Sequence, residues 1–185
     1  MDRGGKAIST SASRFLEQVD DALLRDLYRY WDGLRGERFA PAYRDVDPVA
    51  IPKLLPYLLI TEVEAGPDGR RYRYRLCGTE VEANFGCAMG GHTIDELMRG
   101  KYRAYIEGLY ARLVDTGSPV YSVSAYQDRS LHTKRLMLPL SSDGRHVDMV
   151  LSAQVFFWSA GYPQTLMAIQ EDFETEAERL YGHGK

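Results

Sequence analysis

Few side chains in this sequence could perform chemistry, and their spacing matches no catalytic or metal-binding pattern. Cys77 and Cys87 are the two cysteines, and their separation fits no zinc motif. His132 and His146 are expected on neighbouring strands, about 30 Å apart at ~3.3 Å per residue, which is too far to share a metal ion. The sequence also lacks a serine-hydrolase elbow and a phosphate-binding glycine loop. We therefore predict no metal, no catalytic site and no enzyme activity.

The thirteen tyrosines are the other residues with functional potential. A buried tyrosine combines an apolar ring with a polar hydroxyl, which suits it to orient a small ligand in an apolar pocket. Tyr74 and Tyr102 are candidates because we expect both to point inward, one from a strand and the other from a helix. The alternative is that they are ordinary core residues with satisfied hydroxyl groups.

The composition excludes several classes of partner. The 185 residues are 44% hydrophobic, as in an ordinary globular domain, and carry a formal net charge of −3. No overall field therefore attracts nucleic acid or an anionic membrane. The longest apolar run, residues 54–60, is interrupted by Pro56 and is too short to span a membrane. Residues 1–13 form a flexible Gly/Ser-rich leader without an apolar segment, so we expect a cytoplasmic protein.

Residues 58–65 and 70–77 predict two strands of a β-hairpin around the turn residues 66–69. In the register that we predict, Glu62 faces Arg73 on the outer face and Val63 faces Tyr72 on the inner face. The same register predicts the pairs Glu64–Arg71, Thr61–Tyr74 and Leu59–Leu76. Because acidic residues would neutralise the arginines, the alternating Arg and Tyr residues do not indicate stacking on single-stranded nucleic acid.

Residues 14–36 predict one amphipathic helix that is capped by Ser13 and ends at Gly36. Large exposed apolar patches are unusual on monomers, and we expect the apolar stripe of this helix to be wider than a small sheet covers. The stripe should therefore form a homodimer interface. Its residues are Leu16, Leu23, Leu27, Tyr30 and Leu34.

Residues 37–158 predict the core domain. After the hairpin we expect a short helix over 79–85, a helical turn over 93–98 capped by Thr93, and a long helix over 101–116 that ends at Gly117. Three strands should follow, over 119–127, 131–141 and 145–158, with Asp143-Gly144 as a two-residue turn between the last two. On these strands Leu136, Leu138 and Leu140 should share a face with Val147, Met149 and Leu151.

Two further expectations concern the ends of the chain. The sheet face opposite Leu136, Leu138 and Leu140 carries Phe156 and Trp158. We expect the N-terminal helix to cover this face. Residues 159–185 form a C-terminal tail in which helical spacing predicts one more helix. The apolar positions of that helix are Leu166, Ile169, Phe173, Ala177 and Leu180.

The order of these elements and several motifs resemble the PAS sensory domain family. Asn84-Phe-Gly86 followed by Gly91-His-Thr-Ile-Asp-Glu-Leu97 is similar to the PAS core pattern. Asp47-Pro-x-x-Ile-Pro-x-Leu-Leu-Pro56 and Tyr74-Arg-Leu-x-Gly-Thr79 resemble short bacterial PAS proteins that stand alone, without an attached kinase or cyclase. The resemblance implies an α+β PAS fold, with a five-stranded antiparallel sheet covered on one side by short helices and one long helix.

The resemblance also bears on cofactors. Light-sensing relatives use a cysteine after the glycine pattern, but that position is Ile94 here, and Cys87 lies before the glycines. Haem-binding relatives use a histidine on the long helix, and residues 101–116 contain none. His92 is interpreted as a polar surface residue. We therefore expect no cofactor and a colourless protein.

The resemblance implies a non-catalytic sensory or signal-relay module that acts on a partner protein. We expect it to bind a small, mostly apolar organic ligand between the sheet and the long helix. One alternative is a constitutive homodimerisation or protein-interaction module with a filled core. Another is a small α+β isomerase-like enzyme, which is disfavoured because Glu62 and Glu64 fall on the outer face. The expected ligand-binding residues are Tyr74, Phe85, Leu97, Tyr102, Ile106, Leu109, Leu138, Met149 and Leu151.

Overall fold

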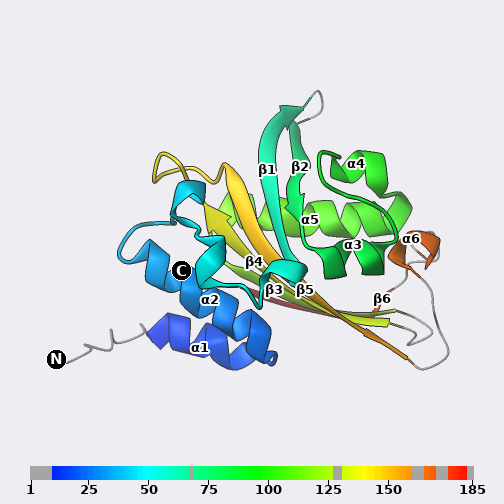
Figure 1. Cartoon of the computed structure of the whole chain (residues 1–185), viewed down its shortest axis with the longest axis horizontal. Helices are drawn as coiled ribbons and strands as arrows, with labels where there is room; N and C mark the ends of the chain where they lie inside the picture. The colour runs from blue at the N-terminus through cyan, green and yellow to red at the C-terminus, as the bar shows by residue number, and fades with distance from the viewer. Residues whose placement is uncertain (1–9, 67–68, 127–130, 160–164, 170–174, 183–185) are drawn as a thin grey trace.

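The computed structural model describes residues 10–66, 69–126, 131–159, 165–169 and 175–182. Its centre is one antiparallel sheet with the strand order β2-β1-β5-β4-β3-β6, and helices lie against both faces (Figure 1). The strands are β1 Leu58–Gly66, β2 Gly69–Cys77, β3 Val120–Tyr126, β4 Leu131–Leu140, β5 Met149–Trp158 and β6 Thr175–Gly182. The helices are α1 Thr10–Gln18, α2 Ala22–Arg35, α3 Thr79–Phe85, α4 Ile94–Leu97, α5 Gly100–Thr116 and α6 Leu166–Ile169, and three 3-10 turns are η1 Tyr43–Asp45, η2 Pro48–Ala50 and η3 Leu55–Tyr57.

The hairpin register is confirmed over most of its length. Glu62 lies opposite Arg73 and Val63 lies opposite Tyr72. Tyr72 and Tyr74 are both buried, which is the opposite of what a stacking surface for nucleic acid would need. The inner face of the hairpin therefore belongs to the core, as the alternation of the sequence predicts.

The register fails at one point, because the pairing shifts between Ile60 and Thr61. Leu59 lies opposite Cys77, so the predicted pair of Leu59 with Leu76 is wrong. A β-bulge of this kind inserts an extra residue and turns the following side chains to the other face. Leu76 accordingly becomes exposed.

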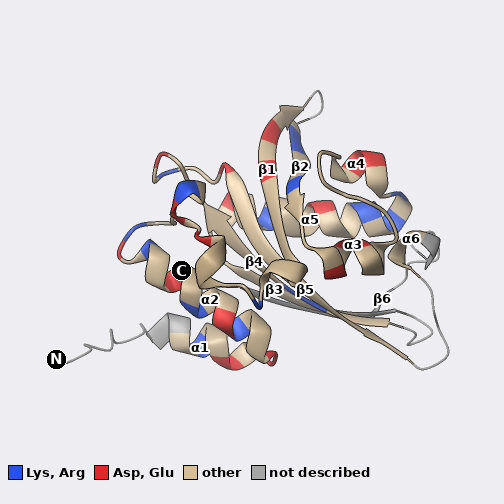
Figure 2. Ribbon diagram, viewed as in Figure 1, with Lys and Arg blue, Asp and Glu red and all other residues tan. Residues whose placement is uncertain are grey.

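The ion pairs of the hairpin are diagonal rather than directly across the strands. Glu64 binds Arg73 at 2.7 Å and Glu62 binds Arg75 at 2.6 Å. The predicted Glu62–Arg73 and Glu64–Arg71 ion pairs are therefore corrected, because a long arginine side chain reaches the carboxylate two residues along the neighbouring strand. Figure 2 shows the acidic bands on β1 beside the basic bands on β2.

The β4–β5 connection is longer than the predicted two-residue turn. Leu140 pairs with Met149 and Leu138 pairs with Leu151. Asp143 holds the loop by accepting backbone N–H groups of residues 145 and 146 at 2.7 and 2.8 Å. The register is offset by two residues from the prediction, and since two residues restore the same face, Met149 and Leu151 keep the predicted face. The prediction is wrong for Val147, which precedes β5 and packs in the other core.

The sheet separates two hydrophobic cores of different origin. α3, α4 and α5 cover one face, where they pack against side chains from β2 and β3. α1 and α2 cover the other face. Phe156 and Trp158 pack on the α5 side, where Trp158 Nε1 donates to Asn84 Oδ1 at 2.7 Å. The expectation that the N-terminal helix covers Phe156 and Trp158 is therefore wrong, because α3 does so.

The predicted single N-terminal helix is two helices, and Ser13 lies inside α1 rather than at a cap. Asp21 caps α2 by accepting the Leu24 N–H at 3.1 Å. The neighbouring Asp20 accepts the Tyr121 hydroxyl and binds Lys134 Nζ at 3.0 Å. These contacts to the sheet favour a break in the helix, since Asp is a better capping residue than an interior residue.

The C-terminal segment forms a sixth strand rather than one long helix. Residues 166–169 are helical, and β6 pairs with β3 in an antiparallel ladder. The helical spacing of apolar residues across 166–180 was therefore misleading, because strand pairing with β3 prevails over it. Phe173, one of the expected helix positions, lies outside the described residues.

Gly78 allows the chain to pass from the hairpin into α3. A Cβ atom at Gly78 would lie 2.2 Å from the carbonyl oxygen of Pro56 and 2.3 Å from that of Leu55. The Gly78 N–H also donates to the Leu58 carbonyl at 2.7 Å. Backbone atoms surround this position, so a side chain cannot be accommodated by a simple rotamer change.

We therefore expect Gly78→Ala to lower the free energy of unfolding by about 2 kcal/mol or more. Gly33→Ala is the matched control, because Gly33 lies within α2 and a Cβ atom there would point into open space. This control should stabilise the protein by about 0.5–1 kcal/mol. Urea unfolding measures both changes, and a Gly78→Ala variant as stable as the parent would contradict the packing described here.

Candidate functional site

Six of the nine expected ligand-binding residues lie together in the core between the sheet and α5. They are buried in a single hydrophobic cluster, and they are Tyr74, Phe85, Leu97, Tyr102, Ile106 and Leu109. Leu138, Met149 and Leu151 belong to the other core, below α1 and α2. The expected lining is corrected for these three residues, because strand alternation turns them away from α5. Ligand binding by the other six stays a prediction.

The stripe expected to form a dimer interface is largely used within the chain. Leu16 and Leu27 are buried, and Leu23 and Tyr30 pack against the core beneath α1 and α2. Leu34 is half-buried. The predicted interface loses its basis, because the second face of the sheet already covers much of the stripe. A homodimer through another surface stays a prediction.

The α5-facing side of the central strands carries a layer of buried polar side chains, which we call the polar layer. It is built from alternate positions of β1, β3, β4 and β5, and most of the intervening residues are apolar and face α1 and α2, with Lys134 as a charged exception. Its members are Thr61, Ser122, Ser124, Thr133, Arg135, Ser152 and Gln154.

Hydrophobicity by itself does not reveal the polar layer in the sequence. On β4 the residues Leu136, Leu138 and Leu140 form the more apolar face, and for that reason hydrophobicity favours this face as the ligand side. The sequence signal for the polar layer lies in the alternate residues of the same strand. Thr133 and Arg135 occupy inward positions there, although the strand is covered on both faces. Polar residues at such positions are uncommon and need partners.

Arg135 is the most unusual member of the polar layer, since only 5% of its surface is exposed. Its Nη2 and Nε donate to Gln154 Oε1 at 2.7 and 3.2 Å across the β4–β5 ladder. Within the described part of the chain, Arg135 Nη1 and Gln154 Nε2 have no hydrogen-bond partner. Among the described residues, no carboxylate forms an ion pair with Arg135.

Four tyrosines of β2 and α5 interact electrostatically with the guanidinium of Arg135. Burial by itself lowers the pKa of Arg135, but Tyr102, Tyr105, Tyr74 and Tyr110 raise it, and the net direction is upward. Burial also raises the pKa of Tyr74 and of Tyr110 above the ordinary value. Tyr74 and Tyr110 are therefore protonated near pH 7, and neither places a full negative charge beside Arg135.

A surface groove lies between the tip of the β1–β2 hairpin and α5. Its volume is about 850 Å³, and its wall includes Tyr72, Gly108 and Ala111. Tyr72 stacks on Tyr110 with 4.9 Å between ring centroids, and the Tyr110 hydroxyl lies 2.8 Å from Thr61 Oγ1. The stacked tyrosines therefore connect the groove to the polar layer.

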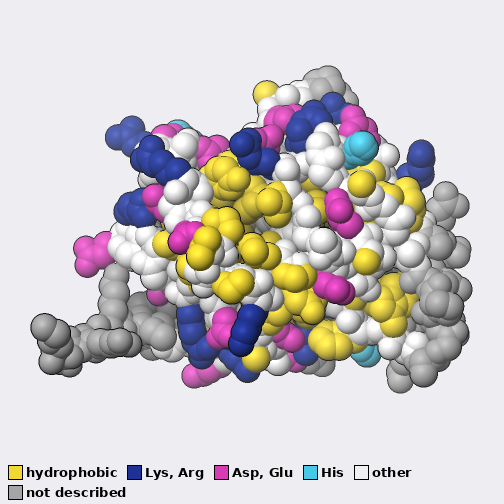
Figure 3. All heavy atoms as spheres, viewed as in Figure 1, with side chains coloured by type: hydrophobic (Ala, Val, Ile, Leu, Met, Phe, Trp, Pro, Cys, Tyr) yellow, Lys and Arg dark blue, Asp and Glu magenta, His cyan; other side chains and the backbone are white. Residues whose placement is uncertain are grey.

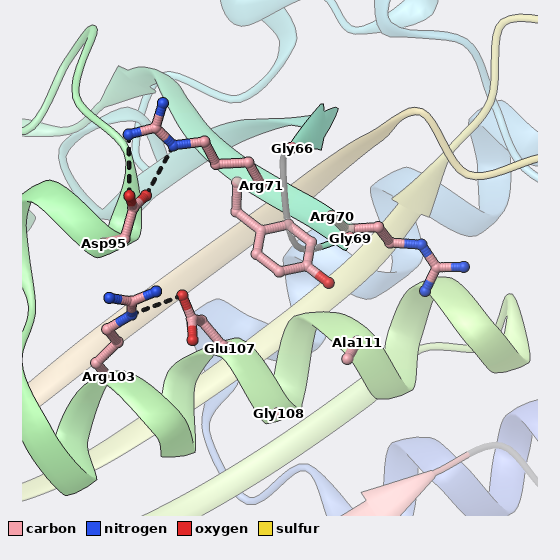
Figure 4. A pocket seen from close by; sticks show the side chains of 10 residues that line it. Gly66, Gly69, Arg70, Arg71, Asp95, Arg103, Glu107, Gly108 and Ala111 are labelled. Atoms are coloured by element: carbon pink, nitrogen blue, oxygen red, sulfur yellow. Dashed lines mark hydrogen bonds and ion pairs between the residues drawn. The ribbon is translucent and has the colours of Figure 1, made fainter.

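The charged groups around the groove neutralise one another. Arg71 forms two hydrogen bonds with Asp95 at 3.0 and 2.9 Å, and Arg103 binds Glu107 at 2.9 Å (Figure 4). Arg71 holds the pKa of Asp95 well below its ordinary value. Since the rim charges are paired and partly exposed, we interpret them as structural.

The residues considered for metal or cofactor chemistry lie apart from this region or are chemically quiet. No group of three or more metal-ligating side chains occurs among the described residues. His92 is exposed and Ile94 is buried at the start of α4. Burial raises the pKa of Cys77 to about 12, with Glu82 adding to it, and burial also raises the pKa of Cys87.

Residues 19–154 match the model of a PAS domain family. This chain belongs to the PAS domain family. PAS domains are generally sensory modules rather than enzymes, and the α+β architecture with an antiparallel sheet agrees with that fold. None of the helices among the described residues of this PAS domain is both long and apolar enough to cross a membrane.

Three solved structures similar to this PAS domain contain light-oxygen-voltage (LOV) domains. A LOV domain studied with a flavin analogue is 15% identical, covers 67% of this chain and 93% of its own, and gives a TM-score of 0.42. The LOV protein of Rhodobacter sphaeroides is 14% identical, with 69% and 74% coverage and a TM-score of 0.42. The LOV domain of the blue-light photoreceptor Aureochrome1 is 13% identical, with 66% and 94% coverage and a TM-score of 0.38. No curated protein matches the chain.

The raised pKa of Cys77 predicts a poorly reactive thiol. At pH 8 about one Cys77 side chain in 10⁴ would be a thiolate, so alkylation by iodoacetamide should be strongly suppressed. Peptide mass spectrometry should find Cys87 modified first in the folded PAS domain. In the unfolded chain both cysteines should react alike, and equal rates in the folded protein would contradict the burial of Cys77.

Proposed function

We propose that this PAS domain is a non-catalytic sensor that binds a small organic molecule between the sheet and α5 and relays its presence to a partner protein. The observation that supports this proposal is the polar layer, which places unpartnered hydrogen-bond donors where a filled core would have apolar contacts. A core that serves stability alone rarely retains buried donors without acceptors. Apolar residues such as Ile106 and Leu109 would contact the body of the ligand.

The relay would run through β4, because this strand contacts both helical layers. Arg135 faces α5, while Lys134, its neighbour, faces the other way and binds Asp20 in the α1–α2 break. Trp31 of α2 donates its indole N–H to the Pro139 carbonyl on the same strand at 2.8 Å. A ligand that prefers one position of β4 would therefore alter the packing of α1 and α2, through its differential affinity for the two arrangements.

An interaction module with a filled core is the second candidate function, and an exposed apolar surface favours it. Hydrophobic side chains gather over the middle of the face seen in Figure 3. Val49 is 84% exposed near the 3-10 turns, and Tyr43 and Leu76 are also exposed. In this alternative the surface would bind a partner protein without any ligand.

Native mass spectrometry of the freshly purified protein, beside its denatured mass, separates the two candidates. We expect the native mass to exceed the chain mass by that of a small molecule. Ile106→Trp should remove this excess, because an indole would occupy the space beside α5. Val49→Trp is the matched control and should retain the excess, since it adds the same indole to the surface.

A different result would support the second candidate. In that case the native mass equals the chain mass in the parent protein, and Ile106→Trp lowers the free energy of unfolding by about 1–3 kcal/mol, as for a packed core. Urea unfolding of the two tryptophan variants measures this cost.

A further inference from the structure

We propose that Arg135 and Gln154 together form the receptor for a carboxylate group, so that the ligand of this PAS domain is a small organic acid. This inference rests on the proposed function, and it adds one charged head group to the small, mostly apolar organic ligand that the sequence leads us to expect.

The first step is the cost of the buried charge. A guanidinium that leaves water must be compensated by an opposite charge or by a full set of hydrogen bonds. Arg135 is 5% exposed and has one side-chain hydrogen-bond partner in the described structure, the neutral amide oxygen of Gln154. The chain therefore maintains a positive charge in its interior without a negative partner among the described residues.

The second step is the chemical type of the unused atoms. Gln154 turns its oxygen toward Arg135, so its Nε2 points its donors elsewhere. Within the Arg135–Gln154 pair, the unpartnered atoms are Arg135 Nη1 and Gln154 Nε2, and both are donors. A group that satisfies both must accept two hydrogen bonds, and a carboxylate does so while also neutralising the guanidinium.

The third step concerns the rest of the ligand. Ser122 and Thr133 are the polar neighbours of Arg135 along and across the strands, but Met137 and Ile106 in the same core are apolar. One guanidinium balances one negative charge, which favours a monocarboxylate over a dianion such as a phosphate. The geometry therefore fits an acid with a single charged head and a mostly apolar body.

The groove gives this acid a route to Arg135. Tyr72 forms part of the groove wall, and Tyr110, which stacks on Tyr72, also belongs to the electrostatic surroundings of Arg135. Gly108 leaves open space on the groove side of α5, with no heavy atom within 4 Å of a Cβ at that position. A turn of the Tyr110 side chain would open the way from the groove to the polar layer.

Thermal unfolding in a Tris–chloride buffer tests the inference after extensive dialysis of the purified protein. The probes are the sodium salts of acetate, propionate, butyrate and benzoate, each compared with sodium chloride at equal ionic strength. The matched amides acetamide, propionamide, butyramide and benzamide have similar shapes without the charge. At ten times the Kd, at least one carboxylate should raise the Tm by about 3–5 °C, and its amide should not.

Variants assign the effect to Arg135. Arg135→Met should abolish the shift by the carboxylate, and it should raise the Tm in chloride alone because the unpaired charge is removed. Arg135→Lys keeps the charge but loses the planar fork, and should weaken the apparent Kd at least tenfold. Arg73→Met is the control, since Arg73 is paired with Glu64 at the surface and should leave the carboxylate response intact.

Three results would overturn the inference. The first is that no carboxylate stabilises the parent protein beyond chloride, the second is that the amides stabilise it equally, and the third is that Arg135→Met retains the response. The proposed function would survive separately if native mass spectrometry then identified a bound neutral molecule whose loss follows Ile106→Trp. If neither a bound molecule nor a carboxylate response is found, both proposals fail.

Discussion

The organisation of this PAS domain depends on one constraint, which is that its central strands are covered on both faces. Most residues of β4 and β5 then enter one of two cores, and the alternation of side chains divides them between the two faces. The two cores differ in chemistry, because α1 and α2 lie on a nearly continuous apolar face whereas α5 lies on a face where polar residues recur. The apolar core beneath α1 and α2 stabilises the fold. This contribution does not depend on which residues make up the core beneath α5.

This division explains how the interior can tolerate Arg135. A buried arginine without a carboxylate opposes folding, and small domains have little stability to spare. Here the opposing core contains Leu136, Leu138 and Leu151, all fully buried against α2. The charge is therefore held by a scaffold that is stabilised elsewhere, which is the arrangement expected of a binding site.

Both helical layers contact the same strand of the sheet, since α2 and α5 each pack on β4. β4 binds α2 through the Trp31–Pro139 hydrogen bond and the α1–α2 break through Lys134 and Asp20. It also carries Arg135 on its other face. The break between α1 and α2, which a single-helix interpretation overlooks, is thus the place where the sheet is tied to the N-terminal segment.

The sequence by itself determined the elements whose signals are local. Turn glycines, caps and alternation were sufficient for the β1–β2 register from Thr61 to Ala65, for α3, and for α5 with its end at Gly117. Only the tertiary structure decided which helices cover which face, because both parities of β4 are compatible with burial. It also decided the bulge before Thr61, the break at Asp20 and the pairing of β6 with β3, since each depends on contacts between segments far apart in the chain. Six residues of the candidate site could be found from periodicity, but Arg135 and Gln154 could not, because hydrophobicity favours the face that lacks them.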